Sequence, residues 1–186
     1  MSPLARIAND FYPTGQALTH ELLKQVKISG KILECCSGDG AIASLFPGCI
    51  TNDFHPLVGH EPTFKLDACN LDSWQAWQGI DWVVTNPPFS LAPSILPLAL
   101  ENARVGVAVL LRLSYLEPCA NRAQWLQKSA DSLSHLIIFN PRPRFRADTR
   151  GNDNVTVAWY VWQHGHQGGT KHTYVHGWYK GVRADG

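Results

Sequence analysis

Short runs of apolar residues recur along the chain, at lengths typical of buried strands. Seven runs predict strands at residues 31–35, 49–52, 64–66, 82–85, 105–111, 135–139 and 155–162. Apolar residues at helical spacing predict helices around residues 18–26, 95–102 and 123–130. Strands that alternate with helices predict an α/β fold, with a parallel sheet covered on both faces. A ligand site in such a fold lies at the carboxyl ends of the strands.

The length of 186 residues suits one domain. We expect this domain to span residues 1–165 and a C-terminal tail without a separate domain to span residues 166–186. The tail begins in a stretch rich in Gly, Gln and His at residues 163–170, which predicts a loop.

Composition predicts a folded, soluble protein, because 45% of the residues are hydrophobic and 17% are charged. No apolar stretch approaches the roughly 18 residues that span a bilayer, and the N-terminus does not resemble a signal peptide. We therefore expect a cytoplasmic protein without a membrane partner.

The five cysteines form no C-x-x-C pair, and the histidines at positions 164, 166, 172 and 176 have no cysteine or carboxylate partners at ligand spacing. We therefore expect buried thiols and no metal.

Two glycines follow the first predicted strand, in the segment Glu34-Cys35-Cys36-Ser37-Gly38-Asp39-Gly40. Gly38 and Gly40 allow a tight turn and close approach of the backbone to a ligand. Ala43 only nearly completes the spacing of a dinucleotide site, and Glu34 would repel a pyrophosphate. A carboxylate here suits an ammonium group or hydroxyls, so we predict a cationic ligand without phosphate. S-adenosylmethionine has these properties.

Two further acidic residues follow the second and third predicted strands. Asp53 could accept hydrogen bonds from both hydroxyls of a ribose, with Phe54 beside an adenine. Asp67 could accept a hydrogen bond from the adenine amine, and Ala68 would leave room for the ring. Each acid alone could be a solvated turn or helix-capping residue. Three acids after three successive strands favour a nucleoside cofactor, here S-adenosylmethionine.

The segment Asn86-Pro87-Pro88-Phe89 follows the fourth predicted strand and is the most specific motif. Two prolines stiffen the backbone and remove two N–H donors. Oδ1 of Asn86 and the carbonyl of Pro87 could accept both hydrogens of an exocyclic aromatic amine, so that its lone pair points toward a methyl donor. Phe89 could stack on the target ring. The alternatives are a turn that ends the strand and a core phenylalanine.

With these motifs the chain resembles the class I S-adenosylmethionine-dependent amino-methyltransferases, especially the small DNA N6-adenine methyltransferases of phages and prophages. The resemblance covers most of residues 9–165. It rests on Asn-Pro-Pro-Phe and on matching segments at residues 10–14, 34–40, 52–53, 110–113, 116–117, 142–145 and 158–162.

The resemblance implies a Rossmann-like fold with one mostly parallel sheet of seven strands, in which residues 155–162 form the antiparallel last strand. It assigns the methionine end of the cofactor to Tyr12, Pro13 and Thr14. It assigns the rest of the cofactor to residues at the strand ends: Glu34, Gly38, Gly40, Asp53 and Asp67. The family commonly has proline where this chain has Gly15 and Cys35, which loosens the fit at the methionine end.

Arginines surround an aromatic residue after the sixth predicted strand: Arg142, Arg144, Phe145, Arg146 and Arg150. Such a mixture suits phosphate contacts and base stacking, and an exposed loop with solvated arginines explains it equally well. Residues 101–186 carry 11 basic and 6 acidic side chains, whereas residues 1–100 carry 5 and 9. The place of the segment in the resemblance favours nucleic acid as the partner.

The sequence thus predicts transfer of a methyl group from S-adenosylmethionine to the N6 amine of adenine in DNA. Short connections at residues 90–104 and 114–134 leave little room for a base-reading region, which predicts a short or relaxed target sequence. RNA adenine-N6, DNA cytosine-N4 and protein glutamine methylation remain alternatives, because each presents a similar planar nitrogen. A noncatalytic cofactor-binding or nucleic-acid-binding module is an alternative of another class, although the intact Gly38, Gly40 and Asn86 argue against it.

Overall fold

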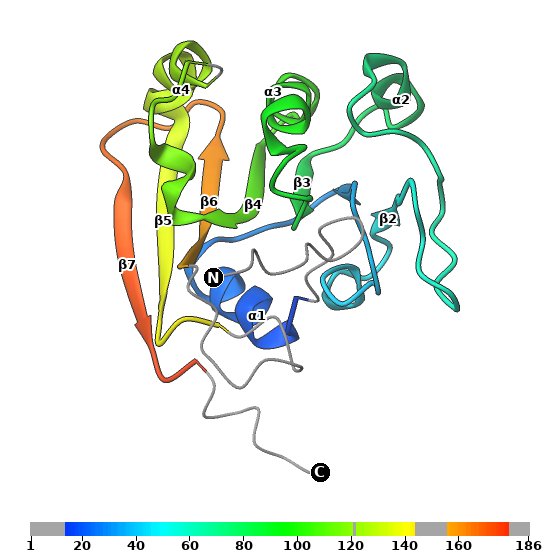
Figure 1. The fold of residues 1–186 in the computed structure, drawn as a ribbon, viewed down its shortest axis with the longest axis horizontal. Coiled ribbons are helices and arrows are strands. Elements are labelled where there is room, and N and C mark those ends of the chain that lie inside the picture. The colour runs from blue at the N-terminus through cyan, green and yellow to red at the C-terminus, as the bar shows by residue number, and fades with distance from the viewer. Residues whose placement is uncertain (1–13, 121, 144–155, 179–186) are drawn as a thin grey trace, which may run out of the picture.

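A computed structural model describes residues 14–120, 122–143 and 156–178 of the chain. Within these residues seven strands form one sheet, in the order β2-β1-β3-β4-β6-β5-β7 (Figure 1). The strands are β1 Ile32–Glu34, β2 Ile50–Thr51, β3 Trp82–Thr85, β4 Gly106–Arg112, β5 Leu133–Asn140, β6 Val157–Gln163 and β7 Lys171–His176. The helices are α1 Gln16–Gln25, α2 Leu71–Ala76, α3 Ala92–Asn102 and α4 Ala123–Ser129.

The direction of the strands confirms the predicted fold. β6 is antiparallel to both of its neighbours, β4 and β5, and every other neighbouring pair is parallel. The antiparallel strand β6, at residues 157–163, overlaps the residues 155–162 that the family resemblance gave as the antiparallel last strand. It is not the last strand of the chain, because β7 follows it. The order turns at β1, which has β2 on one side and β3 on the other, so the chain has the strand switch at which α/β proteins bind ligands.

One predicted strand is absent. Residues 64–66 form no strand, and Phe64 makes only an isolated parallel bridge to Asn52 beyond the end of β2. At this bridge the Phe64 amide donates to the Thr51 carbonyl and the Asp53 amide donates to the Phe64 carbonyl, and beyond it the segment is held by the fully buried Asn52. Its Nδ2 donates to the carbonyls of Cys35 and Leu66, and its Oδ1 accepts from the Leu66 amide. The segment therefore keeps the place of a strand beside β2 without regular pairing.

One observed strand was not predicted. β7 lies at the edge of the sheet, parallel to β5, inside the segment expected to be a tail. Of its six residues only Val175 is buried, and Tyr174 is 63% exposed. A strand that buries so little has no apolar run, so its sequence does not predict it. The predicted loop at residues 163–170 is confirmed from residue 164 onward.

Alternate residues of the strands enter two apolar layers, one on each face of the sheet. Val107, Val109 and Leu111 of β4 pack with α2 and α3, and α4 adds partly buried residues to this layer. Ala108 and Leu110 pack with α1 on the opposite face. Figure 1 shows α2, α3 and α4 on one side of the sheet and α1 on the other. No helix in the described segments is long and apolar enough to cross a membrane.

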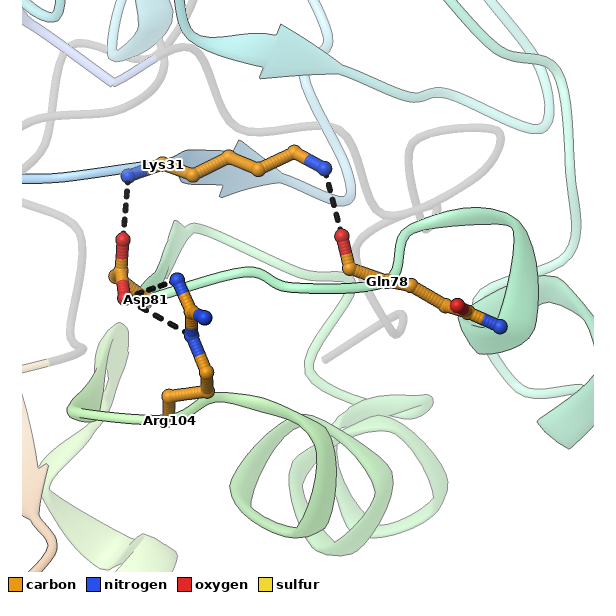
Figure 2. A network of polar contacts seen from close by, with 4 residues as sticks. All are labelled: Lys31, Gln78, Asp81 and Arg104. Carbon is orange, nitrogen blue, oxygen red and sulfur yellow. Dashed lines mark hydrogen bonds and ion pairs between the residues drawn. The ribbon is translucent and has the colours of Figure 1, made fainter.

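A polar network joins the beginnings of β1 and β3 to the connection before β4 (Figure 2). Asp81 accepts from the Lys31 amide at 2.8 Å and pairs with the Arg104 guanidinium at 2.8 Å. The Lys31 ammonium donates to the carbonyl of Gln78. Gly30 has φ +98°, and a Cβ there would overlap the Asp81 carboxylate. The network thus fixes the amino ends of the central strands.

Candidate cofactor and methyl-transfer site

A pocket of about 540 Å³ opens where β1, β2 and β3 end. This volume lies within the roughly 300–1,000 Å³ of typical small-molecule sites. Nine residues that the sequence singled out line it: Thr14, Glu34, Gly38, Asp53, Phe54, Asp67, Ala68, Asn86 and Pro88. The fold therefore gathers residues that are up to 74 positions apart in the chain, as the predicted carboxyl-edge site requires.

The other predicted residues that the structure describes do not line this pocket. Gly40, Pro87 and Phe89 lie beside it in the chain, and Arg142 is exposed after β5. Tyr12, Pro13, Arg144, Phe145, Arg146 and Arg150 lie outside the described residues.

Glu34, the last residue of β1, is only 2% exposed, although it faces the pocket. Its Oε2 accepts from the Ala43 amide at 2.7 Å. Burial raises the pKa of this carboxyl well above its usual range, against the effect of that hydrogen bond, and the nearby acids Asp39 and Asp53 raise it further. A buried acid in an acidic surrounding gains most from a cationic ligand.

The glycine turn holds the wall of the pocket next to Glu34. Gly38 and Gly40 have φ +53° and +77°, values that favour glycine. The Gly38 amide donates to Oδ2 of Asp53 at 2.7 Å, so β1 and β2 are joined at their ends. A Cβ at Gly40 would lie 2.8 Å from the ring of His60, whose Nε2 is 3.1 Å from Oγ of the buried Ser37. Gly40 thus shapes the turn without lining the pocket.

Asp53 and Asp67 also make the local turn contacts that the alternative interpretation expected. Oδ1 of Asp53 accepts from the His55 amide, and Oδ1 of Asp67 accepts from the Cys69 amide, both at 2.9 Å. Each carboxylate oxygen has a second lone pair, so these contacts leave acceptor capacity for ligand hydroxyls or an amine. The turns fix both carboxylates at the pocket wall, and the two interpretations are compatible.

Asn86 follows β3 directly and is oriented by a residue far away in the chain. Its Nδ2 donates to Oγ1 of Thr14, a mostly buried hydroxyl just before α1, at 2.9 Å. Because this bond holds Nδ2, it also fixes the position of Oδ1 in the same planar amide. The Pro88 carbonyl accepts from the amides of Leu91 and Ala92, so the motif runs into the first turn of α3. Both connections hold the Asn-Pro-Pro backbone in one position.

Phe89 is partly buried and packs against both apolar layers. The guanidinium of Arg112 lies over its ring, 4.8 Å from the ring centre. The core interpretation of Phe89 is therefore partly right. Stacking of a target base on this ring remains a prediction.

Other pocket residues were not predicted as site residues. Three thiols, Cys35, Cys36 and Cys69, belong to the wall. A hydrogen bond with Cys35 and burial raise the pKa of Cys36, and burial raises the pKa of Cys69, so both thiols resist ionisation. The sequence could have indicated these cysteines, because they directly follow Glu34 and Ala68, which were predicted as site residues. The wall also contains Leu91, Ser94 and Ile95, which the beginning of α3 brings to the pocket.

The strand order, the antiparallel β6 and the carboxyl-edge pocket together define a Rossmann-like fold of the class I methyltransferase kind. The structure is similar to a modification subunit of a type I restriction enzyme from Vibrio vulnificus YJ016, with a TM-score of 0.66 and 12% identity over 89% of this chain and 47% of that one. It is also similar to the EcoKI M protein, with a TM-score of 0.58 and 13% identity over 80% and 42% of the two chains.

A third similar structure is a predicted O-methyltransferase from Agrobacterium tumefaciens, with a TM-score of 0.55 and 12% identity over 87% of this chain and 86% of that one. The chain thus spans less than half of the two modification subunits and most of the third protein. No family model and no curated protein matches the sequence. At these identities the likeness concerns the fold.

Proposed function

We propose that this protein transfers a methyl group from S-adenosylmethionine to the N6 amine of adenine in DNA, within a short or relaxed target sequence. One observation carries the proposal: Asn86 shares a pocket with the acids Glu34, Asp53 and Asp67. The similarity to modification subunits of type I restriction enzymes supports it at the level of the fold.

The chemistry of the pocket fits S-adenosylmethionine. Glu34 is a buried carboxyl that an ammonium group would compensate, and Asp53 retains acceptor capacity for ribose hydroxyls. Asp67 and Ala68 would receive the adenine, with Phe54 on the exposed side. The walls expose more apolar than polar surface, which suits the adenine and the methylene groups of this cofactor. When bound, this cofactor would supply an electrophilic methyl group.

The residues of this chain then act on the amine that receives the methyl group. Oδ1 of Asn86 and the Pro87 carbonyl accept its two hydrogens, so that the nitrogen lone pair is turned away from the target ring. Thr14 keeps the Asn86 amide in the required orientation through its hydrogen bond to Nδ2. The amine gives up its proton only as or after the new bond forms, so no strong base is needed. Positioning supplies most of the catalysis.

The substrate must present an adenine outside a base stack, because a paired base cannot reach a pocket at the sheet edge. Phe89 would stack on that base. The exposed Arg142, with Arg144, Phe145 and Arg146 of the segment outside the described residues, would contact the DNA backbone. An unpaired strand avoids the cost of flipping a base, so we expect single-stranded DNA to be a better substrate than duplex.

The proposal is tested by incubating the protein and labelled S-adenosylmethionine with random-sequence DNA, RNA of the same sequence and a protein mixture. Mass spectrometry of nucleosides and peptides then identifies the product, and sequencing maps the modified adenines. We expect N6-methyladenine in DNA at many short sites. Label in N4-methylcytosine, in RNA alone or in glutamine would select a different substrate. Cofactor binding without any transfer would favour a noncatalytic module, and a long fixed motif would contradict the relaxed target.

A further inference from the structure

Arg112 is the last residue of β4, next to the proposed acceptor side of the pocket. In the register between β3 and β4, Thr85 lies opposite Val109, so β4 continues three residues beyond the end of β3. The hydroxyl of Tyr160 donates to the Arg112 carbonyl at 3.1 Å, which fixes the backbone. The side chain reaches back toward the catalytic motif, where its guanidinium covers Phe89.

The charge of Arg112 is not compensated within the described part of the chain. None of the ion pairs found there includes this residue, whereas Arg104 at the opposite edge pairs with Asp81. Nε of Arg112 is buried and has no hydrogen-bond partner. Arginine is seldom buried without partners, because its N–H groups lose their water. A guanidinium in this state is prepared for an anionic ligand.

We propose that Arg112 binds a backbone phosphate of the nucleic-acid strand, beside the nucleotide whose base enters the site; this inference rests on the proposed function. Because Nε of Arg112 is buried, the two terminal Nη groups of its guanidinium are the donors that would reach two phosphate oxygens. Arg112 does not line the cofactor pocket, and its guanidinium lies over Phe89, the ring that the proposed function assigns to the target base. Through Phe89 it also positions the ring on which the base would stack.

The test measures binding of a fluorescent single-stranded oligonucleotide at salt concentrations from about 50 to 200 mM. Arg112→Gln should weaken binding and reduce the slope of log affinity against log salt by about 0.7, the value for one lost phosphate contact with a single strand. Arg112→Lys keeps the charge and should retain most of the slope. Lys128→Gln, on the exposed side of α4, is the matched loss of one positive charge and should leave the slope unchanged.

The affinity for S-adenosylmethionine and the melting temperature are measured for the same variants. An unchanged salt slope in Arg112→Gln would overturn the proposal, as would an equal loss of cofactor affinity, which would place Arg112 at the cofactor. A wild-type protein that binds no oligonucleotide would overturn it as well. DNA and RNA oligonucleotides of one sequence are compared, because both carry the phosphate that Arg112 would bind.

This inference and the proposed function can fail separately. Methyl transfer to DNA together with an unchanged slope in Arg112→Gln would leave the function intact and remove the role of Arg112. Binding that depends on Arg112, without methyl transfer to DNA, would support the phosphate contact and contradict the enzymatic proposal.

Discussion

Asn86 is the residue on which the proposed chemistry depends most. We expect Asn86→Ala to retain affinity for S-adenosylmethionine and to lower turnover by about 10² to 10³, the loss seen when one preorganised group of an oxyanion hole is removed. Cofactor affinity from calorimetry and single-turnover rates with DNA check this. Asn102→Ala, which removes an amide at the end of α3 outside the pocket, is the control. Near-normal turnover in Asn86→Ala would contradict the role assigned to this amide.

If the proposed function holds, Glu34 should make binding of S-adenosylmethionine dependent on pH. Below its raised pKa the carboxyl is protonated and offers an ammonium group little, whereas above that pKa the carboxylate binds it. We therefore expect affinity for S-adenosylmethionine to rise with pH and binding to release a proton. Calorimetry in two buffers across the pH range measures both effects. Glu34→Gln should bind weakly with a flat pH profile, while the exposed Glu101→Gln should behave as the wild type.

Glu34 should also lower the stability of the cofactor-free protein at neutral pH. An acid whose folded pKa is raised binds more protons when folded than when unfolded, so its contribution to stability falls as pH rises above the usual glutamate pKa of about 4.3. Glu34→Gln should therefore be more stable than the wild type at neutral pH and no more stable at low pH. Urea unfolding without cofactor measures this difference. Equal stability of the two proteins at neutral pH would contradict the raised pKa.

At the scale of an element, the glycine turn after β1 needs glycine for two reasons: a positive φ and close packing against a neighbouring side chain. Gly40 and Gly48 both have φ +77°, but only a Cβ at Gly40 meets a neighbour, the His60 ring. Gly48→Ala should lower the free energy of unfolding by about 1 kcal/mol, because of the positive φ alone. Gly40→Ala should lower it more and also weaken cofactor binding, because His60 must move away from Ser37. Unfolding and binding measurements on both variants test the difference, and the Gly40→Ala, His60→Ala double variant should recover part of it.

The elements differ in how well their sequences predict them. β3 has the bounds that its apolar run predicts, because all four of its residues are buried between two layers. Only one residue of β7 is buried, so the strand contains no apolar run and was not predicted. Residues 64–66 have an apolar pattern, but their backbone pairing stops at the bridge of Phe64, and the side-chain amide of Asn52 holds Leu66 instead. Whether a segment at the edge of the sheet forms a strand depends on residues distant in the chain, and the local apolar pattern carries no information about them.

At the scale of the whole molecule, the network around Asp81 holds the edge of the sheet opposite the pocket. The hydrogen bond from the Lys31 amide, with the Arg104 pair, lowers the pKa of Asp81. Because its folded pKa is lowered, Asp81 contributes stability above its unfolded pKa of about 3.9, and the contribution is lost as pH falls through the folded pKa. We therefore expect the free energies of unfolding of the wild type and of Asp81→Asn, measured between pH 2 and 7, to differ at neutral pH and to become equal at low pH. The affinity for the cofactor should be the same in both proteins.

A persistent difference between these two proteins at low pH would contradict the role of the Asp81 charge. Gly30→Ala is an independent probe of the same contact, since its Cβ would displace the carboxylate. It should destabilise the protein at neutral pH without altering the pocket.

The sequence by itself determined the sheet class and nine of the described pocket residues, and the family resemblance added an antiparallel strand at residues 155–162, close to the observed β6. It could do so because apolar runs record burial, and because the ends of parallel strands meet at one edge of a sheet. Only the tertiary structure decided that Thr14 orients Asn86, that Arg112 covers Phe89 and that Glu34 is buried in an acidic surrounding. These contacts join residues distant in the chain, and neither periodicity nor spacing encodes which side chains meet across the sheet.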